Sequence, residues 1–196
     1  MSKILYHGTS ADNLKSILKN GFSINCDKIW TPSENGIYFW SPDKLIEYKE
    51  SDEDFADNDA IKRAFDSATC SLGKSKDCRA VIFEIEVSDE EYNDLCEDTS
   101  CPNMEGAIVS YSNINLKYIK KIYISDDLSL LRGYFISLMM ERELNNLTFS
   151  DLELKIGKAF KNFEEGYEIV EEFYEGIEGY NLKEYNKREL FSILKI

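Results

Sequence analysis

The sequence predicts an α+β fold, and three observations lead to this prediction. Strand-like segments alternate with amphipathic helical segments over the first 125 residues. The stretch AVIFEIEVS (80–88) places apolar side chains at every second position, which is the period of a half-buried strand. After residue 126 apolar residues recur at helical spacing, with glycines between the segments. We therefore expect a sheet-containing domain over 1–125 and a helical extension over 126–196 that can pack on this domain.

The first predicted elements are a strand and a helix. Residues 3–7 predict a short strand, because the apolar or aromatic Ile4, Leu5 and Tyr6 follow one another directly. An amphipathic helix is expected over 11–20, because its apolar residues share one face. Ser10 or Asp12 is the expected N-cap, and Gly21 is the expected stop.

A second strand and helix follow at once. GIYFW (36–40) predicts the strand. The helix that follows has a strong start signal, since Ser41 can serve as N-cap, Pro42 suits the first helical position and Asp43 suits the first turn.

The remaining elements have weaker signals. The acidic segment 51–59 opens another predicted helix that runs to about Thr69. GAIVSY (106–111) and KKIYIS (120–125) predict two strands after the alternating segment. The helices expected in the extension cover 127–145, 150–165, 166–176 and 182–194.

Composition limits the class of protein. The chain has 196 residues, of which 43% are hydrophobic and 13% aromatic, so it can bury a sizeable core. The sequence has no apolar run near the ~20 residues needed to span a bilayer, and no signal-type apolar segment at its start. We therefore expect a cytoplasmic protein without a membrane partner.

Charge and cysteines exclude further classes. The net charge of −14 opposes binding to a phosphate backbone, which requires a basic surface. The five cysteines are irregularly spaced and a single histidine accompanies them, so no zinc pattern is present and no metal is expected. We expect reduced thiols, as is usual in the cytosol.

The candidate site residues begin with the only histidine, in ILYHGTS (4–10). His7 stands where the first strand gives way to the first helix. A lone histidine at such a place usually has a structural role, but its neighbours favour a site. Gly8 permits close approach of a ligand to the backbone, and Thr9 and Ser10 offer hydroxyl groups beside the amides of a helix start.

Two further clusters carry chemistry. Tyr38 lies on the second predicted strand and Tyr48 on the helix after it, and two such aromatics can enclose a flat or cationic ring. Core packing is the alternative role for both tyrosines. Glu105 stands before a glycine and an apolar strand, where a carboxylate can project from the end of a strand into a cleft.

These three clusters, in this order, resemble a known family. LYHGTSADNLKSILKNGF, NGIYFWSPDKLIEY and EGAIVSYSNINLKYIKKIYI are similar to the His, Tyr and Glu motifs of poly(ADP-ribose) polymerase-like, or diphtheria-toxin-like, ADP-ribosyltransferases. The resemblance covers about residues 3–125. It implies a split β-sheet core with NAD as the substrate, and it leaves the helical extension unexplained.

The resemblance assigns roles residue by residue. His7 matches the histidine that bonds the adenine-side ribose, and Gly8 matches the glycine whose backbone holds the nicotinamide carboxamide. Tyr38 matches the tyrosine packed against nicotinamide. Tyr48 corresponds to the second stacking tyrosine, with a spacing one residue shorter than the family's. Glu105 matches the catalytic glutamate. Ser41 is a further candidate for bonding the carboxamide.

The implied reaction agrees with the chemistry of these side chains. Cleavage of the nicotinamide–ribose bond builds positive charge on the ribose, as in glycoside hydrolysis, and a carboxylate stabilises that charge where it develops. The implied activity is mono-ADP-ribosylation of a macromolecule. The acidic chain favours a protein acceptor over nucleic acid, and the analogy suggests a bacterial toxin or a phage or bacterial effector, with an inhibitor or antitoxin protein as a further candidate partner.

Three alternatives stay open. Glu84 and Glu86 form the Glu-x-Glu pattern of arginine-modifying toxins, although those enzymes begin with an arginine at the position of His7, and alternation predicts both glutamates on an exposed face. An RNA 2′-phosphotransferase shares the fold but requires clustered arginines, and the first half offers only Arg63 and Arg79. The third alternative is an inactive module of the same fold that binds a partner.

Overall fold

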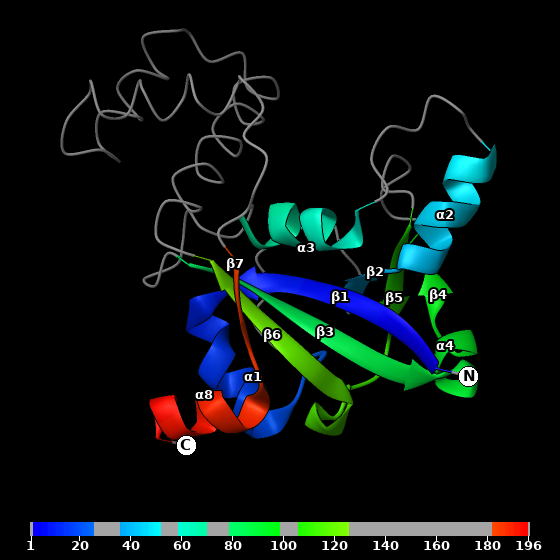
Figure 1. Cartoon of the computed structure of the whole chain (residues 1–196). Helices are drawn as coiled ribbons and strands as arrows, with labels where there is room; N and C mark the ends of the chain where they lie inside the picture. The colour runs from blue at the N-terminus through cyan, green and yellow to red at the C-terminus, as the bar shows by residue number, and fades with distance from the viewer. Residues whose placement is uncertain are drawn as a thin grey trace, which may run out of the picture.

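The computed structural model describes residues 2–25, 36–51, 59–69, 79–98, 106–125 and 182–195. These residues form a seven-stranded antiparallel sheet in the order β4-β5-β2-β1-β3-β6-β7 (Figure 1). Its strands are β1 (Ser2–Ser10), β2 (Ile37–Trp40), β3 (Ala80–Ser88), β4 (Cys96–Glu97), β5 (Ala107–Ser110), β6 (Ile119–Ser125) and β7 (Leu182–Tyr185).

Helices lie on both faces of the sheet. They are α1 (Leu14–Asn20), α2 (Pro42–Ser51), α3 (Ala60–Thr69), α4 (Asp89–Asn93) and α8 (Lys187–Leu194), with the 3₁₀ turns η1 (Ala11–Asn13) and η3 (Leu116–Tyr118). The helices α1 and α8 pack on one face, and α3 crosses the other (Figure 1). The sheet is therefore the middle of three layers.

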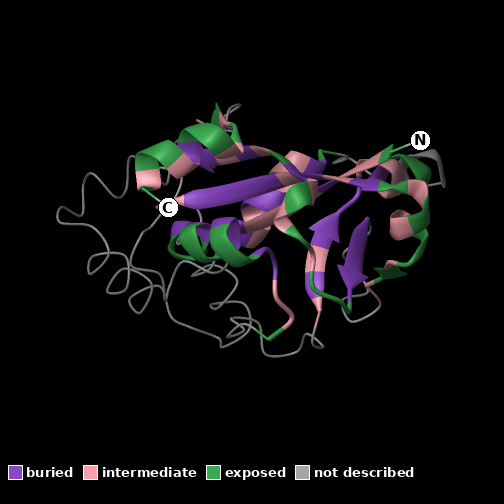
Figure 2. Ribbon diagram, turned by 90° about the horizontal axis from the view of Figure 1, so that it is seen from below, coloured by how far each residue is buried: buried purple, intermediate pink, exposed green. Residues whose placement is uncertain are grey.

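Each face of the sheet has its own apolar cluster. The α1 face buries Leu5, Phe39 and Phe83 together with apolar residues of α1 and α8. The α3 face buries Trp40, Ile82 and the alanines of α3. Figure 2 shows buried positions along the strands and exposed positions on the outer sides of the helices. Alternation of side chains along each strand assigns the residues to the two faces.

The junction between β1 and β2 has fewer register pairs than the other strand pairs of the described sheet. The strands β1 and β3 are paired from Ser2↔Ser88 to Ser10↔Ala80. By contrast, a single register pair, Tyr6↔Trp40, joins β1 to β2 in the part of the chain that the structure describes. The sheet therefore has two parts, β4-β5-β2 and β1-β3-β6-β7, that share one register pair in the described residues.

The α+β class predicted from the sequence is confirmed, and so are most of the predicted elements in the first 125 residues. The predicted strands at 3–7, 36–40, 80–88, 106–111 and 120–125 correspond to β1, β2, β3, β5 and β6. The stop at Gly21 is also confirmed, because this residue ends α1 with a φ of +76°, a backbone conformation that glycine adopts readily.

Two predicted helix starts are corrected. The third helix begins at Ala60 rather than in the acidic segment, because the Asp59 carboxylate accepts hydrogen bonds from the amides of Ile61 and Lys62. The first helix, expected from residue 11, begins at Leu14 after the turn η1, and Asn13 holds its N-cap position in place of Ser10 or Asp12. Ser10 precedes η1 and makes no side-chain cap hydrogen bond. Residues 52–58 of the predicted helix lie outside the described residues.

The end of the chain also differs from the prediction. A helix was expected over 182–194, but Leu182–Tyr185 forms an edge strand that pairs with β6, and the helix covers only Lys187–Leu194. Leu190 of that helix is buried in the α1-face cluster. In the described end of the predicted extension, Leu182–Tyr185 is therefore a strand of the sheet and the last helix packs on it. Residues 126–181 lie outside the described part. Within the described ranges, no helix is long and apolar enough to cross a bilayer.

Candidate functional site

His7 lies at the junction of β1 and β2. Its Nδ1 donates a hydrogen bond to the carbonyl oxygen of Tyr38 over 2.8 Å. Because a carbonyl can only accept, Nδ1 carries the proton and Nε2 of the neutral ring is an acceptor. Burial lowers the pKa of His7 below its usual 6.5, against the opposing effect of the Tyr38 carbonyl. The imidazole is therefore neutral at pH 7.

The His7 ring is held by aromatic contacts. Its centroid lies 5.0 Å from that of Phe22 in an edge-on arrangement, and 5.7 Å from that of Phe39. Both phenylalanines belong to the cluster on the α1 face. The imidazole therefore has a fixed orientation on this face, before any ligand is bound.

Gly8 lies on the other face, under helix α3. A Cβ built on Gly8 would lie 1.6 Å from the carbonyl oxygen of Ala64 and 3.1 Å from the amide nitrogen of Ala68. Since both atoms belong to the helix backbone, no side-chain rotation can relieve the contact. The structure thus gives Gly8 a packing role beneath helix α3.

Thr9 and Ser10 complete the first motif. Both side chains are buried. The Thr9 hydroxyl accepts a hydrogen bond from the Asn13 side chain over 2.9 Å, which ties the end of β1 to the turn before α1. Thr9 therefore contributes to the local fold of the motif.

Tyr38 lies in the middle of β2 and is partly exposed. It is paired with Val109 of β5, and its carbonyl oxygen accepts the hydrogen bond from Nδ1 of His7. Its side chain alternates with that of Phe39, which lies on the α1 face, and therefore points to the α3 face. The structure thus brings together the His7 ring and the Tyr38 backbone, with the two side chains on opposite faces.

Ser41 connects β2 to helix α2, as predicted. It is fully buried, and its hydroxyl accepts a hydrogen bond from the Lys44 amide over 3.3 Å, so it is the N-cap before Pro42. The same hydroxyl is bonded to the hydroxyl of Tyr92 over 2.7 Å. Its backbone amide donates to the carbonyl of Gly106 over 3.0 Å, so β2 and β5 remain together at this end.

Two of the sequence-predicted residues are not fully described. Glu105 lies outside the described residues, and Gly106, the next residue, is the first one described before β5. Tyr48 falls within α2, but its side chain also lies outside the description.

A second polar cluster, which the sequence analysis missed, lies on the α3 face. The Glu84 carboxylate accepts hydrogen bonds from the hydroxyls of Tyr6 over 3.3 Å and Tyr123 over 2.9 Å. Burial and this carboxylate raise the pKa of Tyr6 to about 12, and the same causes raise the pKa of Tyr123. The pairing of β3 with β6 is irregular at Glu84, as at a β-bulge.

This cluster corrects one prediction. Glu84 and Glu86 were expected on an exposed face, but both are only partly exposed. Glu86 forms an ion pair with Lys120 over 2.6 Å, whereas Glu84 is bonded to the two tyrosines. The alternation correctly gave both glutamates the same face, but it contained no information on the tyrosines that cover Glu84.

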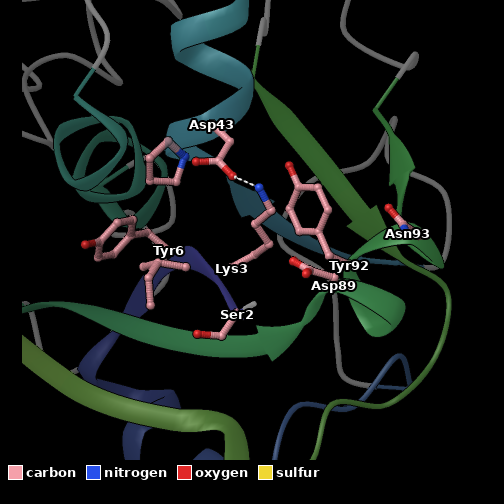
Figure 3. Close-up of a pocket in the computed structure, with 9 residues that line it drawn as sticks. Ser2, Lys3, Tyr6, Asp43, Asp89, Tyr92 and Asn93 are labelled. Atoms are coloured by element: carbon pink, nitrogen blue, oxygen red, sulfur yellow. Dashed lines mark hydrogen bonds and ion pairs between the residues drawn. The ribbon is translucent and has the colours of Figure 1, made fainter.

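A cavity of about 700 Å³ lies near the N-terminal half of β1 (Figure 3). Its lining includes Lys3 and Tyr6 of β1, Asp43 of α2, and Asp89 and Tyr92 of α4. The Lys3 ammonium reaches the Asp43 carboxylate over 2.5 Å, and its nitrogen lies 5.7 Å from the centre of the Tyr92 ring. Sequence patterns did not indicate this site, because its residues come from three separate elements.

Other candidate chemistry is limited among the described residues. Cys96 is an exposed free thiol, and the other four cysteines lie outside the described ranges. No group of three or more histidine, cysteine or acidic residues in the described part is arranged to hold a metal ion.

Comparison of the chain with protein-family models, curated proteins and solved structures gives no significant match.

Proposed function

We propose that this chain is an NAD-dependent mono-ADP-ribosyltransferase. It would break the nicotinamide–ribose bond of NAD and transfer ADP-ribose to a macromolecule. The observation that carries the proposal is the strand order β5-β2-β1. The proposed residues are far apart in the sequence but belong to adjacent strands. His7 is on β1 and Tyr38 is on β2, and Glu105 comes directly before Gly106 and β5 in the sequence. Adjacent strands are what a three-residue site of this kind requires.

The junction of β1 and β2 is the proposed NAD site. The side chains of His7 and Tyr38 lie on opposite faces, so NAD would cross the junction instead of lying on one face. Support for this position comes from the single register pair between the two strands. The hydrogen bond from His7 to the Tyr38 carbonyl fixes the imidazole at this junction.

Each proposed residue has a chemical role in this reaction. The neutral His7 can accept a hydrogen bond from a ribose hydroxyl through Nε2, because Nδ1 is committed to Tyr38. Tyr38 would pack on the nicotinamide ring, with Tyr48 as its partner. Glu105 would bond the ribose 2′-hydroxyl and stabilise the positive charge that develops as nicotinamide leaves. Gly8 and Ser41 stay candidates for the carboxamide.

The acceptor proposed is a protein. The net charge of −14 disfavours a nucleic acid acceptor, since repulsion would oppose its approach. By analogy the enzyme would act as a bacterial toxin or as a phage or bacterial effector, with an inhibitor or antitoxin protein as partner.

One observation favours a second function. Side chains of His7 and Tyr38 on opposite faces are compatible with an inactive module that binds a partner. The two functions differ in a simple measurement, because an inactive module that binds only a protein has no affinity for NAD.

Calorimetric titration with NAD tests the proposal. We expect the wild-type chain to bind NAD, and Tyr38→Ala to weaken binding by roughly 1–3 kcal/mol, since a stacking contact and buried area are both lost. Tyr111→Ala is a matched control, because Tyr111 is an exposed tyrosine just after β5. Absence of NAD binding by the folded wild-type protein would favour the binding module.

A further inference from the structure

The cavity shown in Figure 3 is joined through hydrogen bonds of Ser41 to the residue before β5. Two parts of its lining, one on α2 and one on α4, are connected to Ser41. Pro42 and Asp43 follow Ser41 in the chain, and the Tyr92 hydroxyl is bonded to the Ser41 hydroxyl over 2.7 Å. The amide of Ser41 is bonded to the carbonyl of Gly106, the residue after Glu105. The cavity is therefore connected through Ser41 to the start of β5, which Glu105 precedes in the sequence.

The lining of the cavity matches a cation. It contains two carboxylates, Asp43 and Asp89, against one ammonium, that of Lys3. Tyr6 and Tyr92 supply aromatic rings, and the Lys3 nitrogen already lies 5.7 Å from the centre of the Tyr92 ring. Lys3 pairs with Asp43 over 2.5 Å, and the three charged side chains of the lining sum to one negative charge. A volume of about 700 Å³ is in the range of small-molecule sites, so it leaves room for a guanidinium group.

Among biological cations, a guanidinium group fits this lining best. Its planar face stacks on tyrosine rings, and its edge donates paired hydrogen bonds to a carboxylate. We propose that this cavity binds an arginine side chain of the acceptor protein, next to the catalytic strand end. That the arginine belongs to an acceptor protein rests on the proposed transferase function. Binding of arginine in the cavity can be tested without it.

The structure also assigns a role to Lys3. Its ammonium holds Asp43 and lies near the ring of Tyr92, so it competes with an incoming guanidinium for the same two groups. Removal of this charge frees Asp43 for the guest. The variant Lys3→Met should therefore bind arginine more tightly, a result that a purely structural role of the Lys3–Asp43 pair does not produce.

Calorimetry with acetyl-arginine-amide, without NAD, tests the site. We expect Asp89→Asn to weaken binding by about 10-fold to 100-fold, the usual effect of losing a hydrogen bond to a charged group, and Lys3→Met to strengthen it. Acetyl-citrulline-amide is the neutral isostere and should not bind. Glu90→Gln is the matched control variant, because Glu90 is exposed on the same short helix.

The outcomes separate this inference from the proposed function. Absence of arginine binding, equal binding of citrulline, or wild-type affinity of Asp89→Asn would overturn the arginine site. Nicotinamide release from NAD, measured without the peptide, reports on the transferase alone. Arginine binding without nicotinamide release would leave a cation site in a protein that is not the proposed enzyme, and so would remove the acceptor role.

Discussion

Substitution of Gly8 by alanine tests how closely helix α3 lies on the sheet. The added Cβ would stand 1.6 Å from the Ala64 carbonyl oxygen, whereas real Cβ contacts are not found below 3.0 Å. The helix must therefore retreat by about 1.4 Å. Such a shift loosens the buried contacts of Ala64, Phe65 and Ala68 with the sheet.

The expected cost is large for a single methyl group. Overpacking of a core costs about 1–3 kcal/mol, and the upper end applies here because the obstacle is backbone. For a chain of this length, about 3 kcal/mol corresponds to a decrease in melting temperature of roughly 6–12 °C. Thermal unfolding followed by circular dichroism, together with urea unfolding, measures both quantities.

Two control variants sharpen this test. Ser2→Ala adds no atoms at the exposed start of the same strand and should leave the melting temperature nearly unchanged. The double variant Gly8→Ala, Ala64→Gly should not recover stability, because the clash is with the carbonyl of Ala64 and not with its side chain. A melting temperature of Gly8→Ala close to that of the wild type would refute the close packing of α3 on β1.

The remaining predictions concern titration and ligand contact. His7 is the only histidine, so its imidazole resonances can be assigned directly, and NMR titration should give a pKa below 6.5. Because the folded protein binds the proton of His7 less well than the unfolded chain does, the free energy of unfolding should fall as pH decreases below about 6.5. The variant His7→Gln should remove this dependence. A measured pKa of His7 at or above 6.5 would contradict its burial. The raised pKa of Tyr6 predicts stability that is complete below pH 10 and lost as pH rises towards about 12. Tyr6→Phe should flatten the curve in that range, and an unchanged curve would show that Tyr6 has an ordinary pKa. Tyr48→Ala should weaken NAD binding as Tyr38→Ala does, and unaltered affinity in a folded variant would assign Tyr48 to packing.

Local sequence signals predicted the elements that are determined locally. The alternation in 80–88 gave β3, and Ser41-Pro42-Asp43 gave the start of α2, since both patterns act within a few residues. The short helix α4 also had a local signal that was missed, because Ser88 and Glu91 form a capping box.

Elements and contacts that depend on distant residues were not predictable in this way. The strand β7 has the sequence LKEY, and its pairing with β6 decides its conformation. Likewise the hydrogen bonds from Tyr6 and Tyr123 to Glu84 join three strands. The spacing of residues within a single strand cannot predict them. His7 was correctly placed on the first strand, but this strand continues to Ser10 instead of ending at residue 7. The bond from His7 to the Tyr38 carbonyl depends on how β1 lies beside β2, which no local pattern contains.

The most direct test of the proposed function is nicotinamide release from NAD by the wild type and by Glu105→Gln. Because the carboxylate acts mainly on charge that develops in the transition state, NAD affinity should stay within a few fold while the rate falls by about 10²–10³. Glu86→Gln is the matched control, since Glu86 pairs with Lys120 at the surface and should leave the rate unchanged. An active Glu105→Gln together with an inactive Glu84→Gln would contradict the account and move the catalytic carboxylate to β3.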